Sequence, residues 1–429
     1  MTKQIRLGIA GLGNVGTGLL QRLQKQDELR LNGAFAIAGI SARNRSRSRN
    51  VDISSYEWFD DPVALATSEE TDVFVELIGG SDGSAKLAVE AALKLGKPVV
   101  TANKALIAEH GEHLAKLAEE NNAPLLFEAA VAGGIPVVRA IRESFAGTQI
   151  KSIRGILNGT CNFLLSEMMT TGRDYEDVLA DAQRLGYAEA DPFLDVSGTD
   201  AAHKISILSS LGFRVPMDFS QVSISGVETI SLSDLQLAGK LDHKIKLIAE
   251  AVETEFGVIC RVEPVLLPKG SPLAMIDGPL NAVMIETTHA GNYTLTGPGA
   301  GSDATASAVL GDLAALLSAP SKPVFGVDIN LLNKSFCAQE NVSSAQSKYL
   351  IRVELRDKAG ALASLTERLA GSDVSVEALL QDSAGDSEFA PIAIMTHTCS
   401  LAAAEEAIKR INSLDAVEES ARLIRIESA

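Results

Sequence analysis

The feature that most constrains the fold is a glycine pattern close to the N-terminus. An apolar run of strand length, Ile5–Ile9, is followed by a loop with three glycines and then by a helical pattern. The loop consists of Gly11, Leu12, Gly13, Asn14, Val15 and Gly16. Gly11 permits a tight turn, Gly13 lets the backbone approach a pyrophosphate, and Gly16 lets helix and strand pack closely. Because N–H groups at a helix start hold phosphates, the loop predicts dinucleotide binding; the alternative is an ordinary strand–helix turn.

The residues that follow alternate between apolar runs of strand length and helical stretches. Further strands are expected at Ala34–Ile40, Asp72–Ile78, Pro98–Thr101 and Pro124–Phe127. Helices are expected at Ala85–Leu95 and Glu112–Asn121. Strands that alternate with helices form parallel, doubly wound sheets. We therefore predict an α/β fold with an N-terminal Rossmann-type domain at residues 1–135, completed by part of 300–320.

From about residue 136 the pattern becomes that of a mixed sheet with helices on one face. Candidate strands are Ile150–Leu157, Val258–Leu267, Leu280–Thr287 and Tyr293–Thr296. Candidate helices are Cys161–Thr170, Tyr175–Leu185 and Asp200–Leu211. We predict an α+β domain at 136–320, in which the helix Asp303–Leu317 packs back against the first domain.

The last third of the chain predicts a linker and a small separate domain. Residues 321–348 show little periodicity and are expected to form the linker. A βαββαβ pattern occupies 349–429, which is long enough for a separate domain. Its elements are Tyr349–Leu355, Leu362–Ala370, Val374–Leu380, Ile392–His397, Leu401–Ser413 and Ala421–Ile426.

Length and charge narrow the class of protein. A chain of 429 residues is too long for one ordinary core. Its net charge of −17 disfavours nucleic acid or an anionic membrane as a partner. No apolar run approaches the roughly 20 residues that span a bilayer, and the four cysteines are far apart in the sequence. A cytoplasmic protein with reduced thiols is the expectation.

The end of the second strand bears on the choice between NAD and NADP. An acid at this point would bind the ribose 2′-hydroxyl, but Ile40 is followed by Ser41, Ala42 and Arg43. Arg43 can instead pair with a 2′-phosphate. NADP is favoured without excluding NAD, and the alternative for Arg43 is a solvated basic loop.

Two later strands also end in groups suited to a ligand. Gly79 and Gly80 follow the third strand, where they would bring bare backbone to the cofactor. Thr101 ends the fourth strand, and Lys104 follows it closely. Lys104 is a candidate to contact the cofactor or the reacting oxygen, and the alternative is a surface lysine.

The densest group of polar residues lies between Ala182 and Lys204. Asp200 and Lys204 are four residues apart at the start of a helix, so they share a face. Hydride delivery to a carbonyl carbon leaves an alkoxide, and a lysine ammonium can supply its proton. The carboxylates of Glu189 and Asp195 suit a substrate with an ammonium group. The alternative is an acidic loop with a helix cap and an ordinary salt bridge.

Five ordered motifs resemble those of homoserine dehydrogenases over about residues 1–330. They are the loop at 11–16, Thr101–Lys104, Gly155–Thr160, the segment 182–204, and Gly297–Gly301. The resemblance implies reversible reduction of L-aspartate 4-semialdehyde to L-homoserine with NAD(P)H, on the path to threonine, methionine and isoleucine. It implies that the 136–320 domain binds substrate and forms the dimer.

The resemblance also implies roles for individual residues. Lys204 would be the proton donor, Asp200 would orient or relay, and Lys104 would be a second acid/base candidate. Glu189 and Asp195 would hold the substrate, helped by Gly159, Thr160 and Tyr187, while Gly301 would lie at the cofactor. These side chains and loops are the expected site.

A loop that starts at Glu128 resembles the family's monovalent-cation loop. The implied ligands for sodium or potassium are Glu128, Val131, Gly133 and Ile135. One carboxylate with backbone carbonyls suits such a hard ion, which would be structural. From the sequence alone, Glu128 would be an isolated polar residue at a buried strand end.

Residues 349–429 resemble an ACT domain, a module that often senses amino acids. The implied ligand loop contains Asp357, Gly360, Ala361 and Leu362, although Ala359 stands where proline is common. The implied role is feedback inhibition by L-threonine. The alternative is a domain used only for dimerisation, and a homodimer or homotetramer is expected.

Two other functions remain open at this point. A regulator that only senses nucleotides would need no lysine beside carboxylates, so Lys104 and Lys204 count against it. A dehydrogenase for another semialdehyde or a 3-hydroxy acid is disfavoured, because a simple hydroxy acid would call for arginine to bind its carboxylate.

Overall fold

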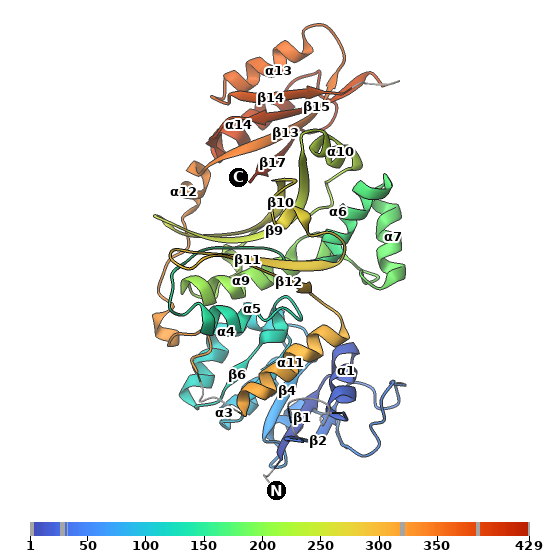
Figure 1. Cartoon of the computed structure of the whole chain (residues 1–429), viewed down its shortest axis with the longest axis vertical. Helices are drawn as coiled ribbons and strands as arrows, with labels where there is room; N and C mark the ends of the chain where they lie inside the picture. Colours follow the sequence, from blue (N-terminus) through green and yellow to red (C-terminus); the bar gives the residue numbers. More distant parts are fainter. Residues whose placement is uncertain (1–3, 26–30, 32, 318–321, 383–386, 428–429) are drawn as a thin grey trace.

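The computed structural model describes residues 4–25, 31, 33–317, 322–382 and 387–427. It arranges them as three units along one long axis, with the N-terminal unit at one end and the C-terminal unit at the other (Figure 1). In the described part of the chain, no helix is long and apolar enough to cross a membrane.

The N-terminal unit is a parallel sheet with helices, as predicted, and it has six strands because Glu57–Phe59 adds to the five that were expected. Its strands are β1 (Ile5–Ala10), β2 (Phe35–Ser41), β3 (Glu57–Phe59), β4 (Val73–Glu76), β5 (Val99–Thr101) and β6 (Leu125–Leu126). Its helices are α1 (Asn14–Leu23), α2 (Pro62–Thr67), α3 (Ser84–Lys94) and α4 (Lys104–Glu120). The strand order β3-β2-β1-β4-β5-β6 reverses its direction of growth between β1 and β4. Ligands of open α/β sheets bind at such a switch point, beside the carboxyl ends of the strands.

Helix α11 (Ser302–Leu316) completes this unit from far along the chain, as expected. It packs against α1. Ala306, Val309 and Leu313 are buried in the same core as Leu7 and Leu19. The loop before α11 is thereby brought beside the dinucleotide loop.

The middle unit holds the predicted mixed sheet, with helices packed against it. Its strands are β7 (Ile150–Ile156), β8 (Ser223–Ile224), β9 (His243–Thr254), β10 (Gly257–Pro268), β11 (Leu280–Thr287) and β12 (Gly291–Pro298). Its helices are α5 (Val137–Arg139), α6 (Gly159–Thr171), α7 (Tyr175–Leu185), α8 (Phe193–Val196), α9 (Thr199–Phe213) and α10 (Leu232–Lys240).

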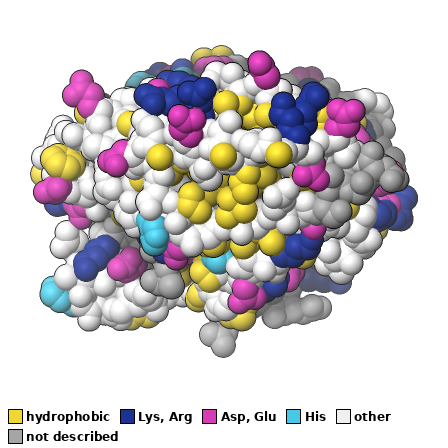
Figure 2. All heavy atoms as spheres, turned by 90° about the horizontal axis from the view of Figure 1, so that it is seen from above, with side chains coloured by type: hydrophobic (Ala, Val, Ile, Leu, Met, Phe, Trp, Pro, Cys, Tyr) yellow, Lys and Arg dark blue, Asp and Glu magenta, His cyan; other side chains and the backbone are white. Residues whose placement is uncertain are grey.

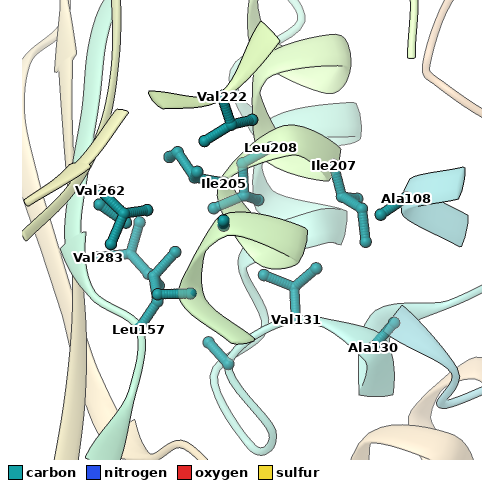
Figure 3. Close-up of a cluster of buried hydrophobic side chains, with 14 of the residues drawn as sticks. Ala108, Ala130, Val131, Leu157, Ile205, Ile207, Leu208, Val222, Val262 and Val283 are labelled. Atoms are coloured by element: carbon teal, nitrogen blue, oxygen red, sulfur yellow. The ribbon is translucent and has the colours of Figure 1, made fainter. Parts of the chain in front are cut away.

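Helix α9 is the centre of the core of this unit. Figure 3 shows Ile205 and Leu208 pointing toward Val262 and Val283 of the sheet, while Ile207 points toward Ala108 of α4. A helix that is buried on all sides is fixed by its packing. The polar residues at its start are therefore held rigidly between the sheet and the N-terminal unit.

The C-terminal unit has the predicted βαββαβ order. It consists of α12 (Gln339–Ser344), β13 (Gln346–Arg356), α13 (Ala361–Ala370), β14 (Val376–Gln381), β15 (Phe389–Thr396), β16 (Cys399–Ser400), α14 (Leu401–Asn412) and β17 (Arg422–Ile426). Its sheet is continuous with that of the middle unit, because β17 pairs in parallel with β10 through Val265↔Arg425 and Leu266↔Ile426. The two units therefore share one sheet of eleven strands.

Buried ion pairs reinforce this junction. Glu250 of β9 is 2% exposed and pairs with Arg425 of β17 at 3.1 Å and with Arg154 of β7 at 2.7 Å. Asp234 of α10 pairs with Arg352 at 2.9 Å and with Arg422 at 2.7 Å. Glu250 and Asp234 of the middle unit are thus each paired with at least one arginine of the C-terminal unit.

The structure adds elements that were not predicted. Strand β9 was missed because its sequence carries Lys246 and Glu250, which are buried in polar clusters. Helix α4 begins eight residues before the expected Glu112, since Gly111 lies inside it. The expected linker is partly packed, with Phe325 1% exposed and its ring 5.8 Å from that of Phe127. The domain limits at residues 135, 320 and 348 stay predictions.

Candidate active site

A cavity of about 680 Å³ lies where the N-terminal unit meets the middle unit. This volume is in the range of small-molecule sites. The predicted site residues that line it are Val15, Gly79, Lys104, Gly133, Gly159, Thr160, Tyr187, Glu189, Asp195, Asp200, Lys204 and Gly301. Residues from more than half the length of the chain are therefore collected in one place.

Lys204 lies in the wall of this cavity, one turn into α9. Its side chain is 8% exposed. Its Nζ donates to the Leu157 carbonyl at 2.6 Å and to Asp200 Oδ2 at 2.7 Å. The ammonium is therefore held in position from two sides, on the same helix face as its carboxylate partner.

Lys104 reaches the same carboxylate from the other unit. It is the first residue of α4, and its Nζ forms an ion pair with Asp200 Oδ1. Its side chain is 41% exposed. A lysine at a helix N-terminus opposes the helix dipole, so its place here is explained by the ion pair rather than by helix stability.

The three charges change one another's affinity for protons. Burial lowers the pKa of Lys204, and the nearby charge of Lys104 lowers it further. The pKa of Lys104 is raised, mainly by attraction to Asp200. Burial opposes ionisation of Asp200, but the two lysines outweigh it and hold the pKa of Asp200 below its usual value. Of the two ammonium groups, Lys204 is the one that gives up its proton more easily.

A second carboxylate, Asp195, stands beside Asp200. The amide Nδ2 of Asn158 donates to Asp195 Oδ1 at 2.8 Å and to Asp200 Oδ2 at 2.9 Å. The Thr160 hydroxyl lies 2.7 Å from the Tyr187 carbonyl and 3.3 Å from Asp195 Oδ2. Burial raises the pKa of Asp195, while its hydrogen bond from Asn158 opposes that rise.

Glu189 and Tyr187 form the outer part of the cavity. Both are exposed, and the Tyr187 ring lies 4.9 Å from that of Phe163. The structure thus brings all the predicted substrate residues together, with Asp195 inside and Glu189 nearer to solvent.

The glycines of the dinucleotide loop have the expected geometry. Gly11 has φ +99°, and a Cβ there would lie 2.2 Å from the Leu77 carbonyl oxygen. A Cβ on Gly16 would lie 2.0 Å from the Gly11 carbonyl oxygen. A Cβ on Gly13 would meet nothing within 4 Å, and no side chain caps α1. Open space before a free helix start fits a dinucleotide phosphate.

The other predicted cofactor residues are dispersed around this loop. The Asn14 carbonyl accepts the Ser302 hydroxyl at 2.6 Å, which ties the loop to α11. Arg43 is exposed two residues after β2. The guanidinium of its neighbour Arg49 donates to the Asn44 carbonyl at 2.8 Å and thereby shapes the basic loop.

Glu76, at the end of β4, supports the cofactor side of the cavity and was missed in the sequence. It is fully buried and accepts the backbone N–H groups of Ile78 at 2.7 Å and Gly79 at 3.1 Å. The Thr101 hydroxyl donates to it at 2.5 Å, so buried Thr101 acts on this loop and does not line the cavity. The sequence signal that could have identified Glu76 is an acid at the end of an otherwise apolar strand.

Asn158 was quoted in a motif but given no role. It directly precedes α6, and its Oδ1 accepts the Cys161 N–H at 2.8 Å, so a helix cap could have been predicted. Its contact with two carboxylates depends on residues about 40 positions away, which no local pattern reveals.

The expected cation loop contains a buried group of charges. Both carboxylate oxygens of Glu128 accept backbone N–H groups, from Val138 at 2.9 Å and Arg139 at 2.8 Å. The Arg139 guanidinium pairs with buried Asp312 at 3.0 Å. Burial, with repulsion from Asp312, raises the pKa of Glu128 to about 7. Burial raises the pKa of Asp312 to about 6.

The rest of that loop faces the dinucleotide side. Val131 is fully buried, and the Ile135 carbonyl accepts the Val137 N–H at 2.8 Å. A Cβ on Gly133 would lie 2.5 Å from the Gly299 carbonyl oxygen. Two carboxylates are thus buried together here, and the Arg139 and Arg142 guanidinium groups both act on Asp312. Carboxylate and carbonyl oxygens are ligands that a monovalent cation takes.

The predicted effector loop lies far from the cavity, at the start of α13. Asp357 and Gly360 are exposed, Gly360 has φ +91°, and Ala361 and Leu362 begin the helix. None of the four lines the main cavity or a second cavity of about 530 Å³ between the middle and C-terminal units.

Three known sequence families match successive parts of the chain. The NAD binding domain of homoserine dehydrogenase matches residues 11–128, the homoserine dehydrogenase family matches 136–314, and the ACT domain matches 349–416. The homoserine dehydrogenase of Neisseria gonorrhoeae is 39% identical over 436 residues, with 99% of each chain covered. That of Pseudomonas aeruginosa is 36% identical over 433 residues, with the same coverage.

Solved structures give the same result. The crystal structure of a homoserine dehydrogenase from Thiobacillus denitrificans is 36% identical, has a TM-score of 0.91 and covers 99% of this chain and 98% of its own. A hyperthermophilic archaeal homoserine dehydrogenase in complex with NADPH is 27% identical, with a TM-score of 0.65, and covers 74% of this chain and 99% of its own.

Proposed function

The chain belongs to the homoserine dehydrogenase family, so it interconverts L-aspartate 4-semialdehyde and L-homoserine with NAD(P), and we propose that Lys204 carries the proton in this reaction. The observation that carries the proposal is the convergence of two lysines on one buried carboxylate in the cavity wall. Asp200 holds Lys104 through Oδ1 and Lys204 through Oδ2.

The two lysines have different tasks. When bound, the nicotinamide supplies the hydride to the carbonyl carbon. The carbonyl oxygen then needs a proton, which Lys204 gives; in the reverse direction Lys204 takes the hydroxyl proton. Its lowered pKa suits this exchange. Lys104, whose pKa is raised, keeps its charge and stabilises the negative oxygen electrostatically.

The substrate ammonium is held by carboxylates. We assign Asp195 and Glu189 to this group, because they are acids on the cavity wall that the lysines leave available. Gly159 and the Thr160 hydroxyl shape the same wall, and Tyr187 covers it from outside.

The cofactor is held by the N-terminal unit. We assign it to the loop at residues 11–16, with Gly79, Lys104 and Gly301 on the nicotinamide side. Thr101 supports the Gly79 loop from behind through Glu76. NADP is the favoured form, because Arg43 and not an acid follows β2, so that a 2′-phosphate would find a cation.

We also propose a sodium or potassium ion at the Glu128 loop. The two buried carboxylates of Glu128 and Asp312 support it, because burial raises the pKa of both and a cation beside them would stabilise their ionised forms. Val131, Gly133 and Ile135 would supply carbonyl oxygens, which such ions prefer.

The C-terminal unit bears on regulation, and the two end strands of the shared sheet bear on assembly. We propose that L-threonine binds at Asp357, Gly360, Ala361 and Leu362 and inhibits the enzyme. We propose a homodimer or homotetramer, because the sheet ends in strands that expose large apolar residues, Tyr293 of β12 (40%) and Leu379 of β14 (37%). The end that carries the C-terminal unit shows a central hydrophobic patch among charged side chains (Figure 2).

A substrate analogue tests the proposed ammonium contacts. Compared with L-homoserine, 4-hydroxybutanoate lacks only the amino group. Its kcat/KM should be lower by about 30-fold or more, since losing one partner of a buried charge pair costs about 2–5 kcal/mol. The Glu189→Gln and Asp195→Asn variants should discriminate less between the two substrates. Equal discrimination by both variants and the wild type would contradict these contacts.

A further inference from the structure

One amide side chain in the cavity wall directs both of its N–H donors at the carboxylates of the site. Asn158 lies between β7 and α6 and is 4% exposed. Its Oδ1 accepts the Cys161 N–H at 2.8 Å. Its Nδ2 donates one hydrogen bond to Asp195 at 2.8 Å and another to Asp200 at 2.9 Å.

We propose that Asn158 is a positioning residue, whose amide holds the Asp195 and Asp200 carboxylates side by side so that one faces the substrate and the other faces the lysines. This inference rests on the proposed function of those two carboxylates. It assigns Asn158 no contact with the reacting atoms.

The chemistry explains why an amide is needed. Two neighbouring carboxylates repel, and a buried pair tends to share a proton. A primary amide has two N–H donors and no charge, so it can serve both carboxylates while its oxygen caps the helix. Serine has one donor and aspartate has none, although both are good helix caps. The cap alone therefore does not require asparagine at position 158.

The electrostatic surroundings of Asp195 make this support important. The ionisable groups that act on it or are influenced by it come from several elements: Asp200 and Lys204 of α9, Lys104 of α4, and Cys161 of α6. The Cys161 thiol stays protonated, because burial raises its pKa well above the usual value. The two lysines are bound to Asp200, so the hydrogen bond from Asn158 is the main direct support of the Asp195 charge.

Substitutions at position 158 separate the helix cap from the positioning role. Asn158→Ser keeps a capping oxygen but cannot bridge the two carboxylates. Asn158→Asp keeps the shape and the cap but adds a third negative group. Asn121→Ser is the matched control, because Asn121 donates only to the Leu117 carbonyl at the far end of α4.

The decisive measurement is the KM for L-homoserine as a function of pH, with kcat, nucleotide affinity and the unfolding midpoint measured beside it. Asn158→Ser should raise KM about tenfold at neutral pH, because the carboxylate that holds the substrate ammonium then loses a charge-assisted hydrogen bond. The pH below which KM climbs should move upward, because Asp195 then takes up a proton more easily. Nucleotide affinity should stay within about threefold, and Asn158→Asp should lose more activity than Asn158→Ser.

Two outcomes distinguish the failure of this inference from failure of the proposed function. If Asn158→Ser lowers only the unfolding midpoint and leaves the pH profile of KM as in the wild type and Asn121→Ser, Asn158 is a helix cap and the positioning role is overturned. If Lys204→Met keeps wild-type turnover and Asp195→Asn keeps the wild-type KM for L-homoserine, the proposed function fails first, whatever Asn158→Ser does.

Discussion

The carboxyl group of Glu128 shows how a single residue links ion binding to stability. It is 4% exposed and shares its surroundings with the buried acid Asp312. An acid whose pKa is raised by folding binds its proton more tightly in the folded chain than in the unfolded one. The stability that protonated Glu128 contributes is therefore fully present at low pH. It is lost as the pH rises from the ordinary pKa of a glutamate through the folded-state pKa of about 7.

A bound sodium or potassium ion should offset this loss. At pH 8, replacing these ions by choline should lower the unfolding midpoint. The free energy of unfolding should fall by at most about 3 kcal/mol, which is the free energy equivalent of raising the pKa of Glu128 to about 7. At pH 5 the same exchange should have little effect, because Glu128 is then protonated. Thermal unfolding in matched buffers measures both.

Two variants decide whether the effect belongs to this residue. Glu128→Gln should remove the dependence on the ion at pH 8. Glu143→Gln should keep it, because Glu143 is a partly exposed acid of the same region that pairs with Lys322. An ion effect of the same size in both variants would locate the cation elsewhere.

At the scale of elements, the turns that begin helices place most of the site. The dinucleotide loop precedes α1, Lys104 begins α4, Asn158 caps α6, and Asp200 lies in the first turn of α9. Local sequence signals mark such positions, which is why the loop at 11–16 and the Asp200–Lys204 pair could be predicted from the sequence.

Elements whose polar residues are satisfied only by tertiary contacts could not be predicted. Strand β9 carries Lys246, whose ammonium is bound by Asn162 and Asp277 from other elements. The sequence spacing indicated only Lys204 as a partner of Asp200. The second partner, Lys104, comes from the N-terminal unit. The contacts of Asn158 with Asp195 and Asp200, and that of Glu76 with Thr101, were missed for the same reason, because these partners are distant in the sequence.

At the scale of the whole molecule, the C-terminal unit is built into the sheet of the middle unit. Strand β17 pairs with β10, and Arg425 reaches Glu250, which also holds Arg154 of β7. Strand β7 leads directly to Leu157, whose carbonyl holds Lys204. Removing residues beyond 340 would therefore expose the edge of β10 and leave Glu250 without its ion pair to Arg425. The proposed inhibition is for this reason better tested in the full chain.

The effector proposal predicts a specific loss of inhibition. L-threonine should inhibit the wild-type chain, and Asp357→Asn should raise the half-inhibitory concentration about tenfold or more, since a charged contact contributes about 1.5–3 kcal/mol. Asp373→Asn is the matched control, because Asp373 is an exposed acid of the same unit in a left-handed conformation that asparagine tolerates. Initial rates over a threonine titration measure the effect.

The control also defines the contradicting result. Equal threonine sensitivity of Asp357→Asn and Asp373→Asn would remove Asp357 from the effector site. If L-threonine does not inhibit the wild-type chain, the role of the C-terminal unit is architectural, as part of the shared sheet and of subunit contacts.

The proton-carrying role of Lys204 is tested most directly by the turnover of L-homoserine in Lys204→Met, which keeps the length of the buried side chain and removes its ammonium. We predict that kcat falls by about 10²- to 10⁴-fold, the usual contribution of a general acid–base group, while the dissociation constant for the nucleotide stays within about threefold. The account is contradicted if Lys204→Met has a kcat within tenfold of the wild type while Lys104→Met is inactive. Lys104 would then be the proton donor.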